Sequence, residues 1–208
     1  MARVVVINDD GPDSVGLRVL VEALRRICDP LVVAPEDSTG GRGKSITILR
    51  PIRIREEGEN FYVVSGTPAD AFLIALELGG GPDLLVSGIN IGPNLGLEDL
   101  LHSGTLGAAL QAVLHGVPAI SISYGLGQGL PKPTEEQLKR DLGLAADLAV
   151  EVASAVLEEG MPEGVDIISI NVPVGADRSR IAITRLFEEP FWRAFPSPDR
   201  DSMVLRPW

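Results

Sequence analysis

The sequence contains few aromatic residues, a single cysteine and no long uninterrupted apolar segment. Aromatic side chains make up 4% of its 208 residues, whereas apolar residues as a whole make up 45%. Valine, isoleucine, leucine and alanine therefore carry the hydrophobicity, as in buried parallel strands covered by helices. Because this content is ample for a core, we exclude an intrinsically disordered chain. The length suits one α/β domain that spans residues 1–208.

The scarcity of cysteine and of long apolar segments limits where the protein can act. Cys28 stands alone, so no intrachain disulfide can form, and we expect a reducing, cytoplasmic location. The most apolar long segment, residues 142–157, is interrupted by Asp147 and Glu151 and cannot span a bilayer. We therefore expect no membrane association.

Positive charge is also scarce. The chain has 18 lysine and arginine residues against 29 aspartate and glutamate residues, which gives a net charge of -11. This charge repels a polyanionic backbone, so we expect no nucleic acid duplex or single strand as a partner. A small phosphorylated ligand is compatible with this charge, because a bound cation reverses the local field.

Apolar runs typical of buried strands alternate with segments of helical periodicity. The runs at 4–7 and 31–34 predict strands, and the spacing from Leu17 to Ile27 predicts a helix between them. Further strands are predicted at 61–64, 84–86, 119–122, 167–172 and 181–184. Further helices are predicted after residue 67, over 103–115 and over 142–157. Alternation at 45–49, 52 and 54 predicts short strands or a hairpin beside the main sheet. Together, these predicted strands and helices indicate a Rossmann-like, doubly wound, mostly parallel sheet with a small β-hairpin appendage, which is an α/β fold.

Polar residues follow three of the predicted strands, where ligands of open α/β sheets bind. These residues are Asn8, Asp9, Asp10, Gly40, Asn90 and Asn94. Because the carboxyl ends of parallel strands meet at one edge of a sheet, we expect the three segments to converge there.

Asp9 and Asp10 are adjacent carboxylates, which repel each other unless a cation or a proton lies between them. Together with the side-chain carbonyl of Asn90 they suit Mg²⁺ or Mn²⁺. We expect one divalent ion per subunit and an ion-activated water that attacks phosphorus. The alternative is that "NDDG" is an ordinary turn, in which Asn and Asp accept local hydrogen bonds and Gly supplies a positive φ.

Ser103, Gly104 and Thr105 open the predicted helix 103–115. The first N–H groups of a helix lack partners and attract anions, so Ser103 or Thr105 is a candidate to bind a phosphate oxygen. The alternative is that Ser103 is an ordinary N-cap.

Taken together, these segments resemble the survival protein SurE family of metal-dependent nucleotidases. The matching stretches are "VVINDDG", "VVAPEDSTGGRGKSITI", "SGTPADAF", "LLVSGINIGPNLG" and "HSGTLGAALQAVLHGVPAISIS". The resemblance covers roughly residues 3–186. It implies hydrolysis of nucleoside 5′- or 3′-monophosphates, a divalent metal and homodimers or homotetramers. By motif position, the metal-binding residues fall on Asp9, Asp10 and Asn90.

Two departures from the family pattern stand out. The family's fourth metal ligand is a serine after "VVAP", and matching places Gly40 there, so its carbonyl, a water, Thr39 or Ser38 must substitute. Family members also continue through a hairpin arm and a final strand, whereas this sequence ends at "MVLRPW". These departures keep a second hypothesis open, namely a non-catalytic nucleotide-binding or regulatory protein.

Overall fold

The computed structural model describes residues 2–125, 132–197 and 202–207, and a seven-stranded sheet forms its centre. The strand order is β3-β4-β2-β1-β5-β6-β7, with β3 antiparallel to β4 and the other neighbours parallel. The strands are β1 (Val4–Ile7), β2 (Leu31–Pro35), β3 (Ile54–Gly58), β4 (Phe61–Val64), β5 (Leu84–Ile91), β6 (Ala119–Gly125) and β7 (Ile167–Pro173). The strands β2, β4 and β3 lie on one side of β1, and β5, β6 and β7 follow on its other side. The predicted fold class is confirmed, and its topological switch point lies between β1 and β5.

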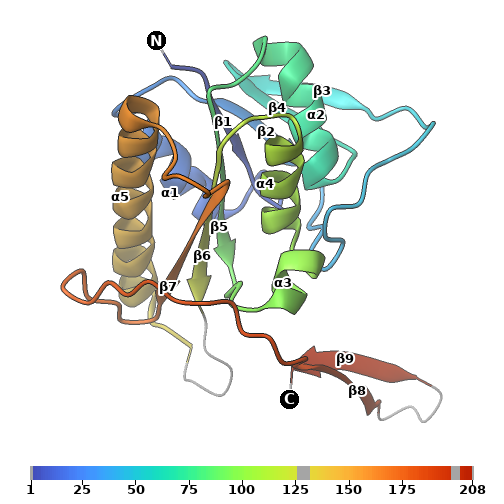
Figure 1. Ribbon diagram of the computed structural model, residues 1–208. Helices are drawn as coiled ribbons and strands as arrows, with labels where there is room; N and C mark the ends of the chain where they lie inside the picture. Colours follow the sequence, from blue (N-terminus) through green and yellow to red (C-terminus); the bar gives the residue numbers. More distant parts are fainter. Residues whose placement is uncertain (1, 126–131, 198–201, 208) are drawn as a thin grey trace.

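Helices cover both faces of this sheet (Figure 1). They are α1 (Val15–Leu24), α2 (Pro68–Gly79), α3 (Leu97–His102), α4 (Gly104–Leu114) and α5 (Glu135–Glu159). The helices α1 and α5 lie on one face, and α2 and α4 lie on the other. The short helix α3 lies at the carboxyl ends of the strands, just before α4.

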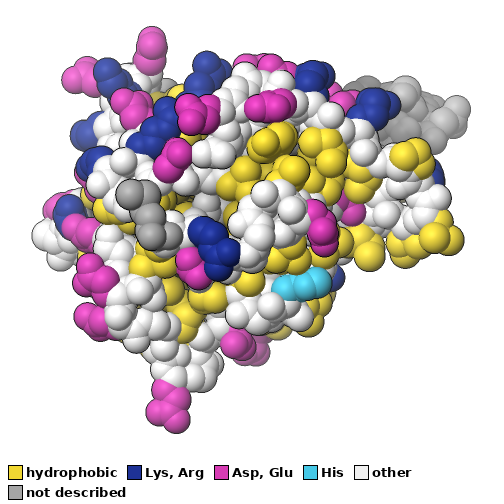
Figure 2. Space-filling view, turned by 90° about the horizontal axis from the view of Figure 1, so that it is seen from above, with side chains coloured by type: hydrophobic (Ala, Val, Ile, Leu, Met, Phe, Trp, Pro, Cys, Tyr) yellow, Lys and Arg dark blue, Asp and Glu magenta, His cyan; other side chains and the backbone are white. Residues whose placement is uncertain are grey.

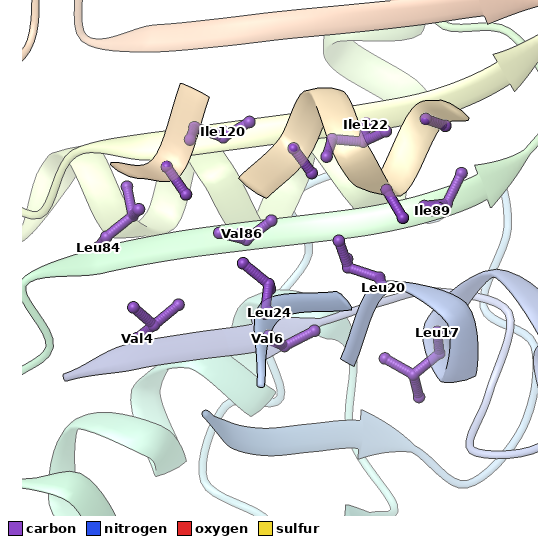
Figure 3. Packing of buried hydrophobic residues seen from close by; sticks show 14 of the residues in the cluster. Val4, Val6, Leu17, Leu20, Leu24, Leu84, Val86, Ile89, Ile120 and Ile122 are labelled. Carbon is purple, nitrogen blue, oxygen red and sulfur yellow. The ribbon is translucent and has the colours of Figure 1, made fainter. Parts of the chain in front are cut away.

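The alternation of side chains along each strand divides the core into two layers. Val4 and Val6 pack toward α1 and α5, whereas Val5 and Ile7 pack toward α2 and α4. Figure 3 shows three leucines of α1 directed at the strands of the first layer; they are Leu17, Leu20 and Leu24. Each buried leucine contributes roughly 1.5–3 kcal/mol. The β-branched runs are thus buried on both sides, as the sequence predicts.

Several predicted elements differ from those observed. Residues 45–53 form no strand; β3 begins at Ile54 and extends the main sheet as an antiparallel edge. The predicted strand 181–184 does not form either, and the side chains of Ile181 and Ile183 are exposed. Both segments carry strand-like patterns, but in the described part of the chain neither pairs along its length with a neighbouring strand, although Arg53 bonds to Ser65 just after β4. The helix predicted over 142–157 begins earlier, at Glu135, because Thr134 and Gln137 form a capping box.

A small hairpin stands apart from the main sheet. Its strands are β8 (Trp192–Pro196) and β9 (Met203–Pro207), which pair antiparallel as a separate two-stranded sheet. Figure 1 shows this hairpin projecting away from the sheet and helices. The appendage therefore lies near the C-terminus, not in the segment 45–54 where we expected short strands.

None of the helices in the described part of the chain has the length and hydrophobicity that a bilayer-spanning segment requires.

Asp141 is a fully buried carboxylate of α5 that joins three parts of the fold. Its Oδ2 accepts hydrogen bonds from the Tyr124 hydroxyl (3.1 Å) and the Gly175 N–H (2.8 Å), and its Oδ1 accepts one from Arg140 (2.9 Å). Burial acts to raise the pKa of Asp141, but these donors together hold it below its ordinary value. Burial and this carboxylate raise the pKa of Tyr124 to about 12.

We expect Asp141→Asn to lower the free energy of unfolding at pH 7 by about 1.5–3 kcal/mol, the usual value of hydrogen bonds to a charged group. Because the folded pKa of Asp141 is depressed, this stabilisation is present above the unfolded pKa of about 3.9 and is lost as pH falls through the folded value. Urea unfolding at pH 7 and pH 3 measures it, and the difference between wild type and variant should shrink at pH 3. The control is Asp147→Asn, whose ion pair with Arg26 is exposed and should contribute less than about 1 kcal/mol. An equal difference at both pH values would contradict the prediction.

Candidate active site

The three polar segments meet at the switch point between β1 and β5, at the carboxyl ends of the strands (Figure 1). The Thr39 N–H, in the loop after β2, donates to the backbone oxygen of Asp9 (2.8 Å). The Ile91 N–H, at the end of β5, donates to the Asp10 carboxylate (3.3 Å). The expected convergence is therefore present, although the segments lie far apart in the sequence.

Asp9 is buried against the N-terminus of α4. Its Oδ1 accepts a hydrogen bond of 2.6 Å from the Thr105 hydroxyl, and the Gly104 N–H also bonds to this residue. A side chain at Gly104 would place its Cβ 2.7 Å from the Cβ of Asp9, so only glycine fits this approach. Burial raises the pKa of Asp9, the Thr105 donor opposes this shift, and the charge of Asp10 adds to it.

Asp10 is half-buried, and burial raises the pKa of its carboxyl as well, against the opposing effect of the Ile91 N–H. Two neighbouring carboxyls whose pKa values are both raised lack sufficient compensation for their negative charge. A cation between them would supply it.

Asn90 follows an irregularity in β5 and precedes Ile91, whose N–H bonds to Asp10. Ser87 pairs with Ser121 and Asn90 pairs with Ser123, so two residues of β5 lie opposite the single residue Ile122. Such a β-bulge redirects the side chains that follow it. The amide nitrogen of Asn90 donates to the Gly92 carbonyl (2.8 Å), which leaves the Oδ1 oxygen as an atom that could coordinate a metal.

The donor set suits a hard divalent cation. It consists of two carboxylates and one amide oxygen, which Mg²⁺ or Mn²⁺ accepts more readily than zinc or copper does. Within residues 2–125, 132–197 and 202–207 no group of three or more His, Cys, Asp or Glu side chains could hold a metal. A third protein oxygen at this site would therefore be neutral, and Asn90 stays our candidate for it.

The turn interpretation of "NDDG" holds only in part: Asn8 and Gly11 form a local turn, but in the described part of the chain the Asn8 side chain donates its hydrogen bond and does not accept one. Asn8 is buried and its amide donates to the Gly11 carbonyl (2.7 Å), while Gly11 adopts a φ of 96°. Its Oδ1 has no hydrogen-bond partner among the described residues. The carboxylates of Asp9 and Asp10 instead contact Thr105 and Ile91, which are 96 and 81 residues away.

The hydroxyls at the start of α4 both bond within the protein. Ser103 accepts a hydrogen bond from the Leu106 N–H (3.2 Å), so it is the N-cap that we named as the alternative. Thr105 is fully buried and donates to Asp9. Their expected contacts with phosphate stay predictions.

Gly40 lies in the loop after β2, next to Thr39. It is exposed, and a Cβ placed on it would meet no atom within 4 Å. Thr39 is buried, and both its N–H and its hydroxyl (3.4 Å) point to the Asp9 backbone oxygen. Because the Gly43 N–H also bonds to the His102 carbonyl (2.7 Å), a shift of this loop would break contacts at two points.

Asn94 lies slightly farther along the edge and is held by two residues that we did not name as site candidates. Its amide donates to the Ser123 hydroxyl (2.8 Å). Its backbone exchanges two hydrogen bonds of 2.9 Å with the Asn171 side chain. Ser123 ends the matching stretch "HSGTLGAALQAVLHGVPAISIS", but nothing in the sequence indicates that it and Asn171 contact Asn94, because these contacts join distant segments.

The family of the chain follows from comparison with known proteins. A family model described as "Survival protein SurE" matches residues 4–192. This chain belongs to the SurE family.

A protein named 5'-nucleotidase SurE from Methanothermobacter thermautotrophicus is 39% identical over 190 residues, which is 88% of this chain and 72% of that protein. A second one, from Thermofilum pendens, is 43% identical over 175 residues, covering 82% and 66%. The crystal structure of the SurE protein from Aquifex aeolicus superposes with a TM-score of 0.79 at 30% identity, covering 99% of this chain and 82% of that one. The resemblance seen in the sequence is confirmed.

We expect Thr105→Val to weaken Mn²⁺ binding about 10- to 100-fold, because residues that orient a metal ligand usually affect metal affinity by this factor. Thr105→Ser retains the hydroxyl that bonds to Asp9 and should bind Mn²⁺ nearly as wild type does. Isothermal titration with Mn²⁺ compares the three proteins. Equal affinities in the Val and Ser variants would show that the Thr105 hydroxyl does not position Asp9.

Proposed function

We propose that this SurE-family chain hydrolyses phosphate monoesters, with nucleoside 5′- and 3′-monophosphates as its substrates. The observation that carries the proposal is the pair of carboxylates, both with raised pKa, that lies beside the Asn90 segment at the switch point of the sheet. The names of the relatives, 5'-nucleotidase SurE, support the substrate class.

Asp9, Asp10 and Asn90 would hold one Mg²⁺ or Mn²⁺ ion per subunit. The chemistry of these residues fits such an ion, since two hard carboxylates with raised pKa values lie beside the segment that carries the amide oxygen of Asn90. When bound, a divalent ion supplies Lewis-acid polarisation of the phosphoryl group.

The protein itself contributes a site that is fixed before the substrate arrives. Thr105 and Gly104 orient Asp9, and the Ile91 N–H orients Asp10. Geometry held in this way removes part of the entropic cost of bringing the reacting groups together. The segments around the carboxylates would surround the phosphate; the residues we assign to it are Asn8, Gly40, Asn94, Ser103, Gly104 and Thr105.

A second function, nucleotide binding without catalysis, is favoured by one observation. Gly40 offers no side-chain oxygen at the position where the family pattern has a serine ligand, and Thr39 already bonds to the Asp9 backbone. If the metal binds too weakly for catalysis, the chain would bind nucleotides without hydrolysing them. Release of phosphate from AMP with Mn²⁺, with Mg²⁺ and with EDTA separates the two.

We also propose that the chain forms homodimers or homotetramers. Large apolar side chains are exposed on and beside α3 and on β9; they include Leu95, Leu97, Leu101, Met203 and Leu205. Figure 2 shows apolar side chains gathered on the side from which the hairpin projects. An isolated two-stranded hairpin is only marginally stable in water, so a second copy of the chain is a suitable covering for it. The cytoplasmic location and the absence of a nucleic acid partner stay predictions from composition.

We expect Asp9→Asn and Asp10→Asn each to lower phosphate release from AMP at least about 100-fold, because each removes one charge of the pair that would bind the metal. The folded state should persist, since the change removes charge and little volume. The matched control is Asp13→Asn, an exposed aspartate in the same "NDDGPD" segment, which should keep wild-type activity. EDTA should abolish the wild-type rate, and Mn²⁺ should restore it. Near-normal rates for Asp9→Asn at saturating Mn²⁺ would overturn the assignment.

We expect Gly40→Ser to bind Mn²⁺ at least about 10-fold more tightly than wild type, since an added oxygen ligand at a carboxylate site raises affinity. The space around Gly40 is open, so a serine side chain meets no obstacle. Gly40→Ala adds the same Cβ without an oxygen and serves as the control. If serine and alanine have the same effect in a Mn²⁺ titration, position 40 does not face the ion.

A further inference from the structure

Three aromatic residues cluster at the base of the hairpin, although the chain has only nine in total (5 Phe, 2 Trp and 2 Tyr). The ring centroids of Phe187 and Phe191 lie 6.3 Å apart, and those of Phe191 and Trp192 lie 6.0 Å apart. A third of the aromatic residues of the protein therefore lies within one short segment, and we call these three the aromatic cluster.

The aromatic cluster is attached to the segment that directly follows Asn94. The Phe187 N–H donates to the Leu95 carbonyl, and the Leu97 N–H donates to the Phe187 carbonyl, both at 2.9 Å. A Cβ on Gly96 would lie 3.1 Å from the Phe191 ring, so this ring packs directly on the Gly96 backbone. Asn94 belongs to the predicted phosphate site, and the cluster is therefore one or two residues farther out along the same loop.

Glu98 fixes the position of the cluster. Its Oε2 accepts hydrogen bonds from the N–H groups of Phe191 (2.6 Å) and Trp192 (3.1 Å). These two bonds hold the pKa of Glu98 below its ordinary value; burial opposes them, and the charge of His102 adds to them. The backbone beneath the rings is thus anchored to α3.

The rings are anchored but not buried. Phe187 is 48% exposed and Trp192 is 41% exposed, whereas Phe72 and Tyr124 are fully buried. The ring planes are tilted by 53° and 33° to each other, so neighbouring rings do not cover each other's faces. Rigid, open aromatic faces beside a phosphate site are the features on which nucleobases stack.

We propose that the aromatic cluster binds the base of the nucleoside monophosphate by stacking, and so distinguishes nucleotides from base-free phosphate esters. The inference rests on the proposed function, because it takes the phosphate position from Asp9, Asp10 and Asn90. The phosphate would lie between the carboxylates and Asn94, and the base would lie against Phe187 and Trp192.

The first test compares AMP with ribose 5-phosphate, which has the same phosphate and sugar but no base. Phe187→Leu and Trp192→Leu keep an apolar side chain and remove the aromatic face. Stacking contributes roughly 1–3 kcal/mol per base, so kcat/KM for AMP should fall roughly 5- to 150-fold through KM, with ribose 5-phosphate unaffected. The control is Phe195→Leu, whose ring on the same hairpin lies beneath the guanidinium of Arg206 at 4.2 Å. Equal losses for both substrates would show a structural or subunit-contact role and overturn the inference.

The second test measures binding without turnover. In a Trp208→Phe background Trp192 is the only tryptophan, and AMP should quench its fluorescence whereas ribose 5-phosphate should not. Absence of quenching by AMP overturns the base site whatever the activity. Quenching by AMP without phosphate release under Mn²⁺ or Mg²⁺ supports the base site and overturns the proposed hydrolysis instead.

Discussion

The contact between Asp9 and the N-terminus of α4 is the constraint on which the site depends. A buried carboxylate next to a second one is costly, and the Thr105 hydroxyl and the Gly104 N–H offset part of that cost. The same contact ties the end of β1 to α4, while the bond from Ile91 to Asp10 ties it to β5. The elements on either side of the switch point are thus joined through the two acidic side chains.

The surrounding segments keep this arrangement rigid. The loop after β2 is fixed to Asp9 by Thr39 and to the end of α3 by Gly43. Farther along, the Thr47 backbone and hydroxyl both donate to the buried carboxylate of Asp70 at the start of α2 (2.8 and 2.7 Å). Because the loop is attached at three points, it resists movement. The open space around Gly40 therefore results from the missing side chain of glycine and not from a displacement of the loop.

Two features of the chain lie outside the contacts of the carboxylate pair. The space around Gly40 is open, and the aromatic cluster links the hairpin to the loop that carries Asn94. In our proposals the first would affect how tightly a metal binds, and the second would affect which esters are recognised. Because one proposal concerns the metal and the other concerns the base of the substrate, they can be tested separately.

The sequence by itself determined the strands at 4–7 and 31–34, the doubly wound, mostly parallel class of the sheet and the residues Asp9, Asp10 and Asn90 as candidates, because these follow from local patterns and motif order. It left open whether Ser103 is an N-cap or a phosphate contact. Only the tertiary structure decided that Thr105 faces Asp9 and that Ser123 and Asn171 hold Asn94. It also decided that 181–184 is not a strand and that 97–102 is a helix. The physical reason is that strand pairing and side-chain hydrogen bonds need partners that are distant in the chain, as Thr105 is 96 residues from Asp9. A local period of alternation contains no information about such partners.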